Sequence, residues 1–544
     1  MTFNMIKPVL GLTFSSLLLA GCGATSALIS TPVENIDTVP LKVTALSDTQ
    51  KQNWGHLDLT KDTVPGMSVQ TAYSEIIKDK KGKKVIVAVI DSGMDLEHED
   101  LKNVLWTNKK EISGNNKDDD KNGYVDDIHG YNFLGDSYNE QLEMARIVRL
   151  GLGDATTQYE ANTKFEKKYN EALKGKQQIE QNLQFVTNAD KGVQQALGKK
   201  IYTKEEVAAL KPTDQAMQQN VGIMMQVFSF GESVAEVLEG LQEGVNYYAE
   251  QLNYNLNKDF NGRKVVGDDP YDITDTNYGD GNPQNRYDDE SHGTHVAGII
   301  AAERGNGKGV DGVANNVALM SIRAVPNGDE YDKDIALGIR YAVDNGAKII
   351  NGSFGKSFSP KAEWVYDAIK YAASKDVLFV HAAGNDGAFL DDVANANFPN
   401  DQIANGAEIA DNVITVGALT NTYGSEMVSS FSNYGNINVD VFAPGSEVYS
   451  TVPGNKYDFN SGTSMAAPGV AGVAALIRSQ YPKLSASQVK KIILQSGLSP
   501  ATSVVKPGNS GSTKFNTLSK SGKIVNAYNA LILASKVASG NVKL

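Results

Sequence analysis

Residues 460–477 decide the fold and read Asn460-Ser461-Gly462-Thr463-Ser464-Met465-Ala466-Ala467-Pro468-Gly469-Val470-Ala471-Gly472-Val473-Ala474-Ala475-Leu476-Ile477. A Gly-Thr-Ser turn runs into small and apolar residues, which predicts a buried helix with Ser464 at its N-terminal, N–H-rich end. A hydroxyl at that position serves either as a helix N-cap or as a nucleophile. The N-cap is the commoner role when such a motif stands alone.

Two further stretches favour the nucleophile. Residues 291–298, Ser-His-Gly-Thr-His-Val-Ala-Gly, begin another helix of small residues with the imidazole of His292 at its start. Residues 85–93, Val-Ile-Val-Ala-Val-Ile-Asp-Ser-Gly, form an apolar run that predicts a parallel strand buried on both faces and ending in the carboxylate of Asp91. The three motifs together supply an acid, a base and a nucleophile.

The chain order Asp91, His292, Ser464, each inside an extended motif, resembles that of the subtilisin-like serine peptidases, or subtilases. The resemblance covers about residues 53–536, apart from one long insertion. It implies that His292 takes the proton of Ser464 as this hydroxyl attacks, and that Asp91 holds the imidazole in the required tautomer. It also implies that Asn385 and the backbone N–H of Ser464 stabilise the oxyanion.

A second histidine, His295, follows His292 by three residues and opens a metal alternative. The zinc-peptidase pattern H-E-x-x-H is absent, so we interpret His295 as a buried packing residue.

Substrate recognition is also implied by the resemblance. An extended peptide would pair with exposed main chain, which gives broad sequence tolerance. The segments matching the family's first specificity pocket are Ser353, Phe354 and Gly355 on one side and Ala382, Ala383 and Gly384 on the other. Asn397 is expected at the floor of this pocket.

Buried strands alternate with helical segments after residue 317. This alternation predicts right-handed crossovers and a mainly parallel sheet. We therefore predict an α/β, three-layer subtilisin-like fold with helices on both faces of the central sheet and an inserted α-helical subdomain.

An acidic loop at residues 115–127 reads D-x-D-x-N-G-x-x-D-D, with oxygen ligands at alternate positions and a Gly at the tight bend. This pattern favours Ca²⁺ over the alternative, a solvated acidic loop, although no Glu stands at the twelfth position as in an EF-hand. The predicted ligands are Asp118, Asp120, Asn122, Tyr124, Asp126 and Asp127. Asp100 matches a calcium ligand of compact family members and is a candidate for a second site.

Composition changes between residues 136 and 259, where Gln, Glu, Lys, Ala and Leu dominate. Apolar residues recur at helical spacing, which predicts three to five helices inserted between the Asp and His motifs. Packing against the core is the favoured interpretation. A coiled-coil partner-binding surface is the alternative, although the heptads that it would need are not sustained.

Bulk composition excludes some partners. The 544 residues carry a net charge of −13, which argues against nucleic-acid binding. The single cysteine, Cys22, allows no intramolecular disulfide. It follows Leu19-Ala20-Gly21 and a short apolar run, a pattern that resembles a bacterial lipobox. We expect cleavage before Cys22 and acylation of its thiol, giving a lipid-anchored protein of the bacterial cell envelope facing away from the cytoplasm.

The predicted organisation is a signal peptide (1–21), a flexible tether (22–52), a first peptidase part (53–135), the helical insertion (136–259) and a second peptidase part (260–544). The predicted function is that of a lipid-anchored serine endopeptidase forming an acyl-enzyme on Ser464. The alternative is a catalytically silent surface adaptor that binds a partner through the insertion.

Overall fold

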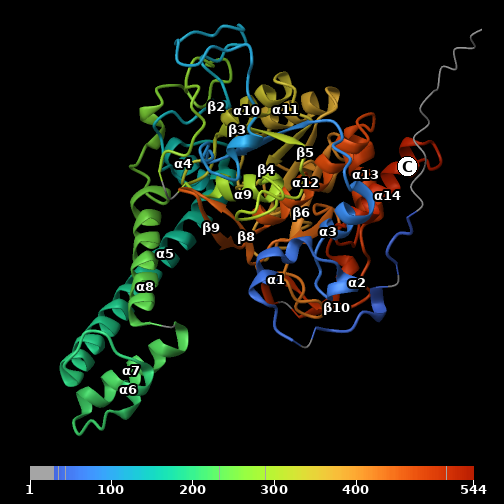
Figure 1. Cartoon of the computed structure of the whole chain (residues 1–544). Helices are drawn as coiled ribbons and strands as arrows, with labels where there is room; N and C mark the ends of the chain where they lie inside the picture. The colour runs from blue at the N-terminus through green and yellow to red at the C-terminus, as the bar shows by residue number, and fades with distance from the viewer. Residues whose placement is uncertain (1–29, 35, 43, 232, 288–289, 510) are drawn as a thin grey trace, which may run out of the picture.

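A seven-stranded parallel sheet forms the centre of the molecule (Figure 1). The computed structural model describes residues 30–544 except 35, 43, 232, 288, 289 and 510. The strand order is β2-β3-β1-β4-β5-β6-β7. The strands are β1 (Val85–Asp91), β2 (Gly130–Asn132), β3 (Val317–Arg323), β4 (Ile349–Gly352), β5 (Leu378–Ala382), β6 (Val413–Leu419) and β7 (Val441–Pro444).

The central strands are buried on both faces, as their unbroken apolar runs predict. Along β1, Val85, Val87 and Val89 belong to one core cluster, whereas Ala88 and Ile90 belong to the cluster on the opposite face. Strand β1 lies between β3 and β4, and both neighbours run parallel to it. The chain therefore departs in opposite directions from β1, and such a switch point is where open α/β sheets place their sites.

Helices cover both faces, so the predicted three-layer α/β fold is confirmed (Figure 1). One face packs against α9 (His292–Ala301), α12 (Thr463–Gln480), α13 (Ala486–Ser496) and α14 (Ala527–Ala538). The other packs against α10 (Asp332–Asp344) and α11 (Ala362–Ser374). The observed strands and helices here lie within a few residues of the segments expected from the alternating pattern.

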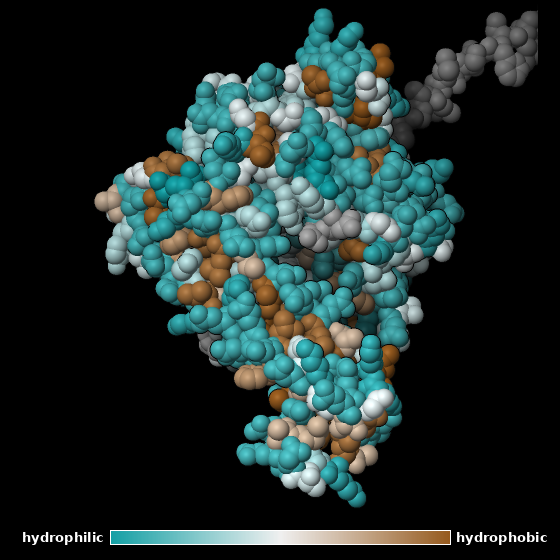
Figure 2. Space-filling model, turned by 90° about the vertical axis from the view of Figure 1, so that its left-hand side faces the viewer, coloured by the Kyte–Doolittle hydropathy of each residue, from teal (hydrophilic) through white to brown (hydrophobic). Residues whose placement is uncertain are grey.

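An arm of helices projects from the sheet domain between β2 and α9 (Figure 1). It comprises α4 (Glu143–Leu150), α5 (Ala155–Leu197), α6 (Lys204–Ala209), α7 (Gln215–Phe230) and α8 (Val234–Glu250). The 43 residues of α5 span about 65 Å. Both α7 and α8 pack along α5. Figure 2 shows apolar side chains in patches along the arm, between hydrophilic ones.

Two small antiparallel sheets were not expected from the alternating pattern. Strands β8 (Val448–Val452) and β9 (Lys456–Asn460) form a hairpin immediately before the Ser motif. Strands β10 (Ser503–Val505) and β11 (Ser512–Lys514) form the second sheet. The remaining short helices near the N-terminus are α1 (Asp48–Asn53), α2 (Leu59–Asp62) and α3 (Val69–Thr71), the last continuing into a π-helical turn at Ala72–Ile77.

The described part of the predicted tether, from residue 30, lies against the domain and is not free, which corrects that expectation. Val33 donates its N–H to Asn529 Oδ1 at 2.8 Å, and Ile36 is 4% exposed within a core cluster. Val33, Val39 and Leu46 pack against the same cluster, so several apolar residues hold this otherwise polar segment to the domain. The signal peptide and Cys22 lie outside the described residues.

No single helix among the described residues is long and apolar enough to cross a membrane.

Candidate active site

The carboxylate of Asp91 and the imidazole of His292 are in contact at the carboxyl end of β1. Asp91 is the last residue of β1 and is buried, and His292 is the first residue of α9. The distance from His292 Nδ1 to Asp91 Oδ1 is 2.7 Å. A carboxylate accepts only, so Nδ1 carries a proton and Nε2 of the neutral ring is left with a free lone pair. The arrangement fixes the tautomer that a general base at Nε2 requires.

Electrostatics favour the protonated imidazole. Burial lowers the pKa of His292, but the charge of Asp91 and the hydrogen bond that the imidazole donates to its carboxylate outweigh burial and raise the pKa above the ordinary 6.5. The imidazole side chain keeps 39% of its surface exposed, so a substrate can reach it. His295, in contrast, is fully buried and contacts the Asp458 carbonyl, and burial lowers its pKa to about 4. The packing role predicted for His295 agrees with this burial.

Ser464 is the second residue of α12, at the helix's N-terminal end. Helices α9 and α12 pack against each other, which brings the His and Ser motifs to one region of the molecule. The Ser464 hydroxyl donates to the Ser353 carbonyl at 3.2 Å, and no hydrogen bond joins it to His292 in the described residues. The hydroxyl must therefore leave this carbonyl, by rotation about its Cα–Cβ bond, before the imidazole can accept its proton. Such contacts often tighten only when substrate is bound.

Pro468 explains a second link between the catalytic helix and Ser353. Proline has no N–H, so Pro468 cannot donate to the carbonyl four residues earlier, which is that of Ser464. The Ser353 hydroxyl donates to this carbonyl instead, at 2.8 Å. Asn351 donates its side-chain amide to the same hydroxyl at 2.9 Å. The segment after β4 is thereby joined to the start of α12.

The side-chain amide of Asn385 is oriented by Thr463. The Thr463 N–H and hydroxyl both donate to Asn385 Oδ1, each at 2.9 Å. Because Oδ1 must be the acceptor here, the amide NH₂ is left as the donating end. The Thr463 hydroxyl accepts from the Gly384 N–H at 3.0 Å. The side chain predicted to donate to an oxyanion is thus held from both sides next to Ser464.

Thr463 is a functional residue that the sequence reasoning missed. Its signal was present in the Gly-Thr-Ser turn, where a hydroxyl precedes the nucleophile. Nothing in the linear sequence indicated that this hydroxyl would reach Asn385, which lies 78 positions away.

The two predicted specificity segments lie on neighbouring parallel strands. Ser353, Phe354 and Gly355 follow β4, whereas Ala382 ends β5 and is followed by Ala383 and Gly384. The Asn397 side chain lies close to both segments. A Cβ on Gly355 would stand 2.6 Å from Asn397 Oδ1, and a Cβ on Gly384 would stand 3.4 Å from Asn397 Cγ. A larger residue at position 355 would therefore displace the Asn397 amide.

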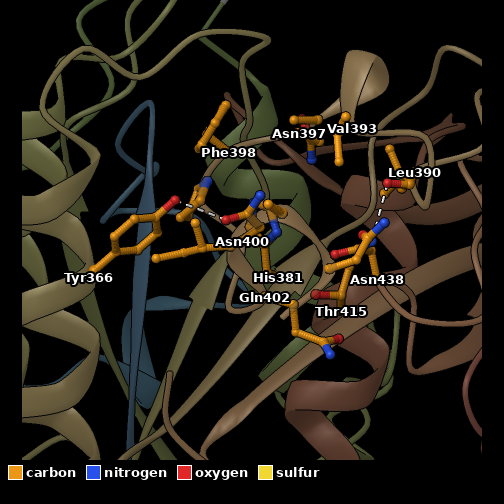
Figure 3. A pocket seen from close by; sticks show the side chains of 15 residues that line it. Tyr366, His381, Leu390, Val393, Asn397, Phe398, Asn400, Gln402, Thr415 and Asn438 are labelled. Carbon is orange, nitrogen blue, oxygen red and sulfur yellow. Dashed lines mark hydrogen bonds between the residues drawn. The ribbon is translucent and has the colours of Figure 1, made fainter. Parts of the chain in front are cut away.

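A cavity of about 220 Å³ lies behind Asn397. Figure 3 shows Tyr366, Asn400, His381 and Thr415 around it, with the Tyr366 hydroxyl donating to Asn400 Oδ1 at 3.0 Å. His381 Nε2 lies 2.8 Å from the Phe354 carbonyl, and burial lowers the His381 pKa to about 4. A neutral ring that donates to this carbonyl supports the first specificity segment from below.

Three carboxylates converge in the acidic loop. The oxygens of Glu111, Asp118 and Asp120 lie within 4.8 Å of one another. Glu111 Oε1 accepts from the N–H groups of Asp119 and Asp120, but its Oε2 is buried and has no protein partner. Buried carboxylate oxygens facing other carboxylates need a cation to offset repulsion. The donor set fits Ca²⁺, and Glu111 was missed because it lies outside the contiguous loop motif.

Four other predicted ligands also have partners within the protein. Asp126 accepts from the N–H groups of Gly114, Asn115 and Asn116. Asp127 accepts from Asn108, Asn122 and the Tyr341 hydroxyl. Tyr124 packs against Tyr131 and Tyr341. Asn122 Oδ1 accepts from the Tyr124 N–H. These residues shape the loop around the three carboxylates.

Asp100, the candidate ligand of a second calcium site, is fully buried. Its carboxylate accepts from Asn306 Nδ2 at 2.5 Å and from the Val310 N–H at 3.2 Å. No second cluster of acidic groups forms around it in the part of the chain that the structure describes.

A parallel α/β sheet that carries an acid–imidazole pair, a helix-terminal serine and an oriented amide at one edge defines a protein of the serine-peptidase class. Residues 82–519 match the Subtilase family, and the chain belongs to this family.

Relatives differ in how much of their length matches this chain. The thermophilic serine proteinase of Bacillus sp. strain AK1 is 40% identical over 223 residues, which are 41% of this chain and 49% of that protein. Thermitase of Thermoactinomyces vulgaris is 39% identical over 231 residues, which are 42% of this chain and 72% of thermitase. A solved protease structure from Pseudoalteromonas arctica PAMC 21717 is 32% identical, covers 45% of this chain and 70% of its own, and has a TM-score of 0.36. The chain thus spans about half the length of the Bacillus relative.

Proposed function

We propose that this chain is a serine endopeptidase that hydrolyses peptide bonds in proteins or peptides through an acyl-enzyme on Ser464. The observation that carries the proposal is the 2.7 Å contact between Asp91 and His292, which leaves Nε2 as the accepting nitrogen beside the helix that bears Ser464. As the hydroxyl attacks the peptide carbonyl, His292 accepts its proton and later donates that proton to the leaving amine. Water then hydrolyses the ester by the reverse proton transfers.

Charge on the carbonyl oxygen would be stabilised by two donors, the Asn385 NH₂ group and the backbone N–H of Ser464. The second residue of a helix has no partner for its N–H within the helix. In subtilisin, a member of this same family, removing one such side-chain donor costs about 2.7–4 kcal/mol of transition-state stabilisation.

Replacing Ser464 by Ala tests the proposal. Loss of the nucleophile costs about 2 × 10⁶ in kcat in subtilisin, and we expect a loss of comparable size here. Hydrolysis of a peptide library should be measured by mass spectrometry, with wild type and Ser464→Ala in parallel. Wild-type rates in the variant would refute the assignment. A fluorophosphonate probe should label wild type only, and an unlabelled wild type would favour the catalytically silent adaptor.

We further propose that the acidic loop binds Ca²⁺ through Glu111, Asp118 and Asp120, with a structural role. Support comes from the unpartnered, buried Glu111 Oε2 and its two neighbouring carboxylates. A bound cation would offset their mutual repulsion and thereby stabilise the loop.

Calcium removal provides the test of this site. The melting temperature of the Ser464→Ala protein should fall in chelator and recover with added Ca²⁺. Glu111→Gln should have a lower calcium affinity, whereas Asp126→Asn, outside the ligand set, should retain more of it. A melting temperature that does not change in chelator would refute the proposed calcium site.

We propose in addition that the mature chain is anchored through lipid on Cys22 at the extracytoplasmic side of the bacterial envelope. The Leu19-Ala20-Gly21-Cys22 pattern supports this proposal. Cys22→Ser should release the protein from the membrane fraction and abolish labelling by a fatty-acid analogue. Continued labelling of the variant would contradict lipidation at this residue.

A further inference from the structure

The base of the helical arm and the peptidase domain enclose a groove of about 470 Å³. From the arm it is lined by Ile147, Leu152, Thr157, Glu160 and Lys164, which belong to α4, its C-terminal loop and the first turns of α5. From the peptidase domain it is lined by residues 357–360 and by segment 393–398. The groove therefore exists only because the arm is present.

This groove lies next to the segments predicted to form the first specificity pocket. Phe358 is three residues beyond Gly355, and Phe398 directly follows Asn397. Lys356 and Phe398 pair as an antiparallel bridge, with N–O distances of 2.9 and 3.1 Å. Segment 393–398 thus separates the cavity behind Asn397 from the groove.

The groove is also within reach of a substrate. Ser353, whose carbonyl accepts from the Ser464 hydroxyl, precedes Phe358 by five residues. Five extended residues span at most about 18 Å. An extended peptide whose scissile bond lies at Ser464 can therefore place a residue in the groove when it extends by about six residues on that side.

The walls define what such a residue would meet. Val393 is 61% exposed at the edge, and Phe358 and Phe398 add aromatic surface. The Lys164 ammonium donates to the Ala394 carbonyl at 3.2 Å and lies 5.1 Å from the centroid of the Phe358 ring. These contacts hold the ammonium in place, yet no carboxylate lies within 4.0 Å of it among the described residues. The wall therefore holds the Lys164 ammonium over an apolar surface, with the Glu160 carboxylate one helical turn earlier in the same lining.

The Lys164 ammonium also interacts electrostatically with a residue next to the predicted oxyanion site. Burial lowers the pKa of its ammonium, while the charges of Glu160 and Asp386 act in the opposite direction. Asp386 directly follows the predicted oxyanion residue Asn385.

We propose that this groove is a substrate-binding subsite for an acidic side chain flanked by apolar residues, with Lys164 as the specificity-determining residue. The inference rests on the proposed endopeptidase function, since the occupant is the peptide being cleaved. An ion pair at a partly exposed site is worth up to about 1 kcal/mol, so a three- to five-fold preference for Glu over Lys at one substrate position is expected.

The charge-reversal variant Lys164→Glu tests this assignment. Cleavage sites in a peptide library should be sequenced for wild type, Lys164→Glu and the matched control Lys174→Glu, which makes the same change at an exposed position farther along α5. We expect the Glu-over-Lys preference at one position to reverse in Lys164→Glu and to persist in Lys174→Glu. Val393→Ser should weaken selection for an apolar neighbour. Profiles that are the same in wild type and Lys164→Glu would overturn the proposal.

Binding separates a failure of this inference from a failure of the catalytic proposal. In the Ser464→Ala background, a fluorescent peptide with the acidic residue should bind less tightly once Lys164→Glu is added, by about three- to five-fold in anisotropy titrations. Loss of binding without any cleavage by wild type would retain the groove and refute the hydrolytic function. Equal peptide affinities of the Ser464→Ala protein with and without Lys164→Glu, with cleavage by wild type intact, would refute the proposed subsite and leave the hydrolytic function standing.

Discussion

The pKa of His292 determines the pH range in which Ser464 can be activated. Burial lowers this pKa, but Asp91 outweighs burial through its charge and its hydrogen bond, so the pKa lies above 6.5. Below the raised pKa the imidazole is protonated and cannot accept the serine proton. We therefore expect kcat/KM to fall as the pH decreases, with a midpoint above 6.5, in an initial-rate pH profile with a short peptide substrate.

A substitution at Asp91 tests whether its carboxylate raises the pKa of His292. Asp91→Asn removes the negative charge, so any residual activity should have a midpoint shifted to lower pH. Its rate should fall by about 10⁴, as in the comparable triad of another serine peptidase fold. A midpoint that stays unchanged would show that Asp91 does not set the pKa of His292.

Individual side chains were predictable where one motif contained the whole signal. Asp91 ends a strand, His292 and Ser464 lie in the first turn of a helix, and Asn385 follows a strand by three residues; such positions can be recognised from local pattern. Glu111 was not predictable, because it joins Asp118 and Asp120 only through the folding of the loop. The resting contact of the Ser464 hydroxyl with the Ser353 carbonyl was not predictable either, since it depends on a side-chain rotamer.

At the scale of single elements, a buried ionic cluster joins α4 to the segment that follows Gly355. Lys356 Nζ lies 2.8 Å from Glu143 Oε2 and 2.9 Å from Asp332 Oδ1, and Arg146 lies 2.6 Å from Glu143. All four side chains are at most 7% exposed. Removing one partner leaves charges that are buried and uncompensated.

Glu143→Ala should therefore destabilise the protein by about 3–5 kcal/mol, measured as a lower midpoint of urea unfolding in the Ser464→Ala background. The control is Glu180→Ala, which removes a partner from the exposed Lys176–Glu180 pair on α5 and should cost about 0.5 kcal/mol or less. Equal effects of the two substitutions would contradict a stabilising role for the buried cluster.

Elements were predicted well where burial on both faces or helical period left a strong pattern, as in β1, β5 and α12. The hairpin β8–β9 was missed because its second strand, Lys456–Asn460, is largely exposed and alternates polar with aromatic residues. The packing of residues 30–52 was missed because its apolar residues, Val33, Ile36, Val39 and Leu46, give no clear helical or strand period.

At the scale of the whole molecule, the sheet domain and the arm differ in how much side-chain surface they bury. Sixteen residues of α12 are buried, whereas α7 buries only Met224 and Val227, and α8 buries none. Local opening free energy rises with buried apolar contacts, so the arm should open without unfolding of the sheet.

Hydrogen exchange monitored by mass spectrometry tests this difference, in the Ser464→Ala background to prevent self-cleavage. Amides of α7 and α8 should exchange roughly a hundred-fold or more faster than those of α12. The first turns of α5 should instead be protected like the domain, because Ala161 and Phe165 are buried there beside the groove. If the amides from α5 to α8 were all protected as strongly as those of α12, the arm and the sheet would unfold as one unit. Rapid exchange in the first turns of α5 would leave the groove without the fixed wall that charge selection by Lys164 requires.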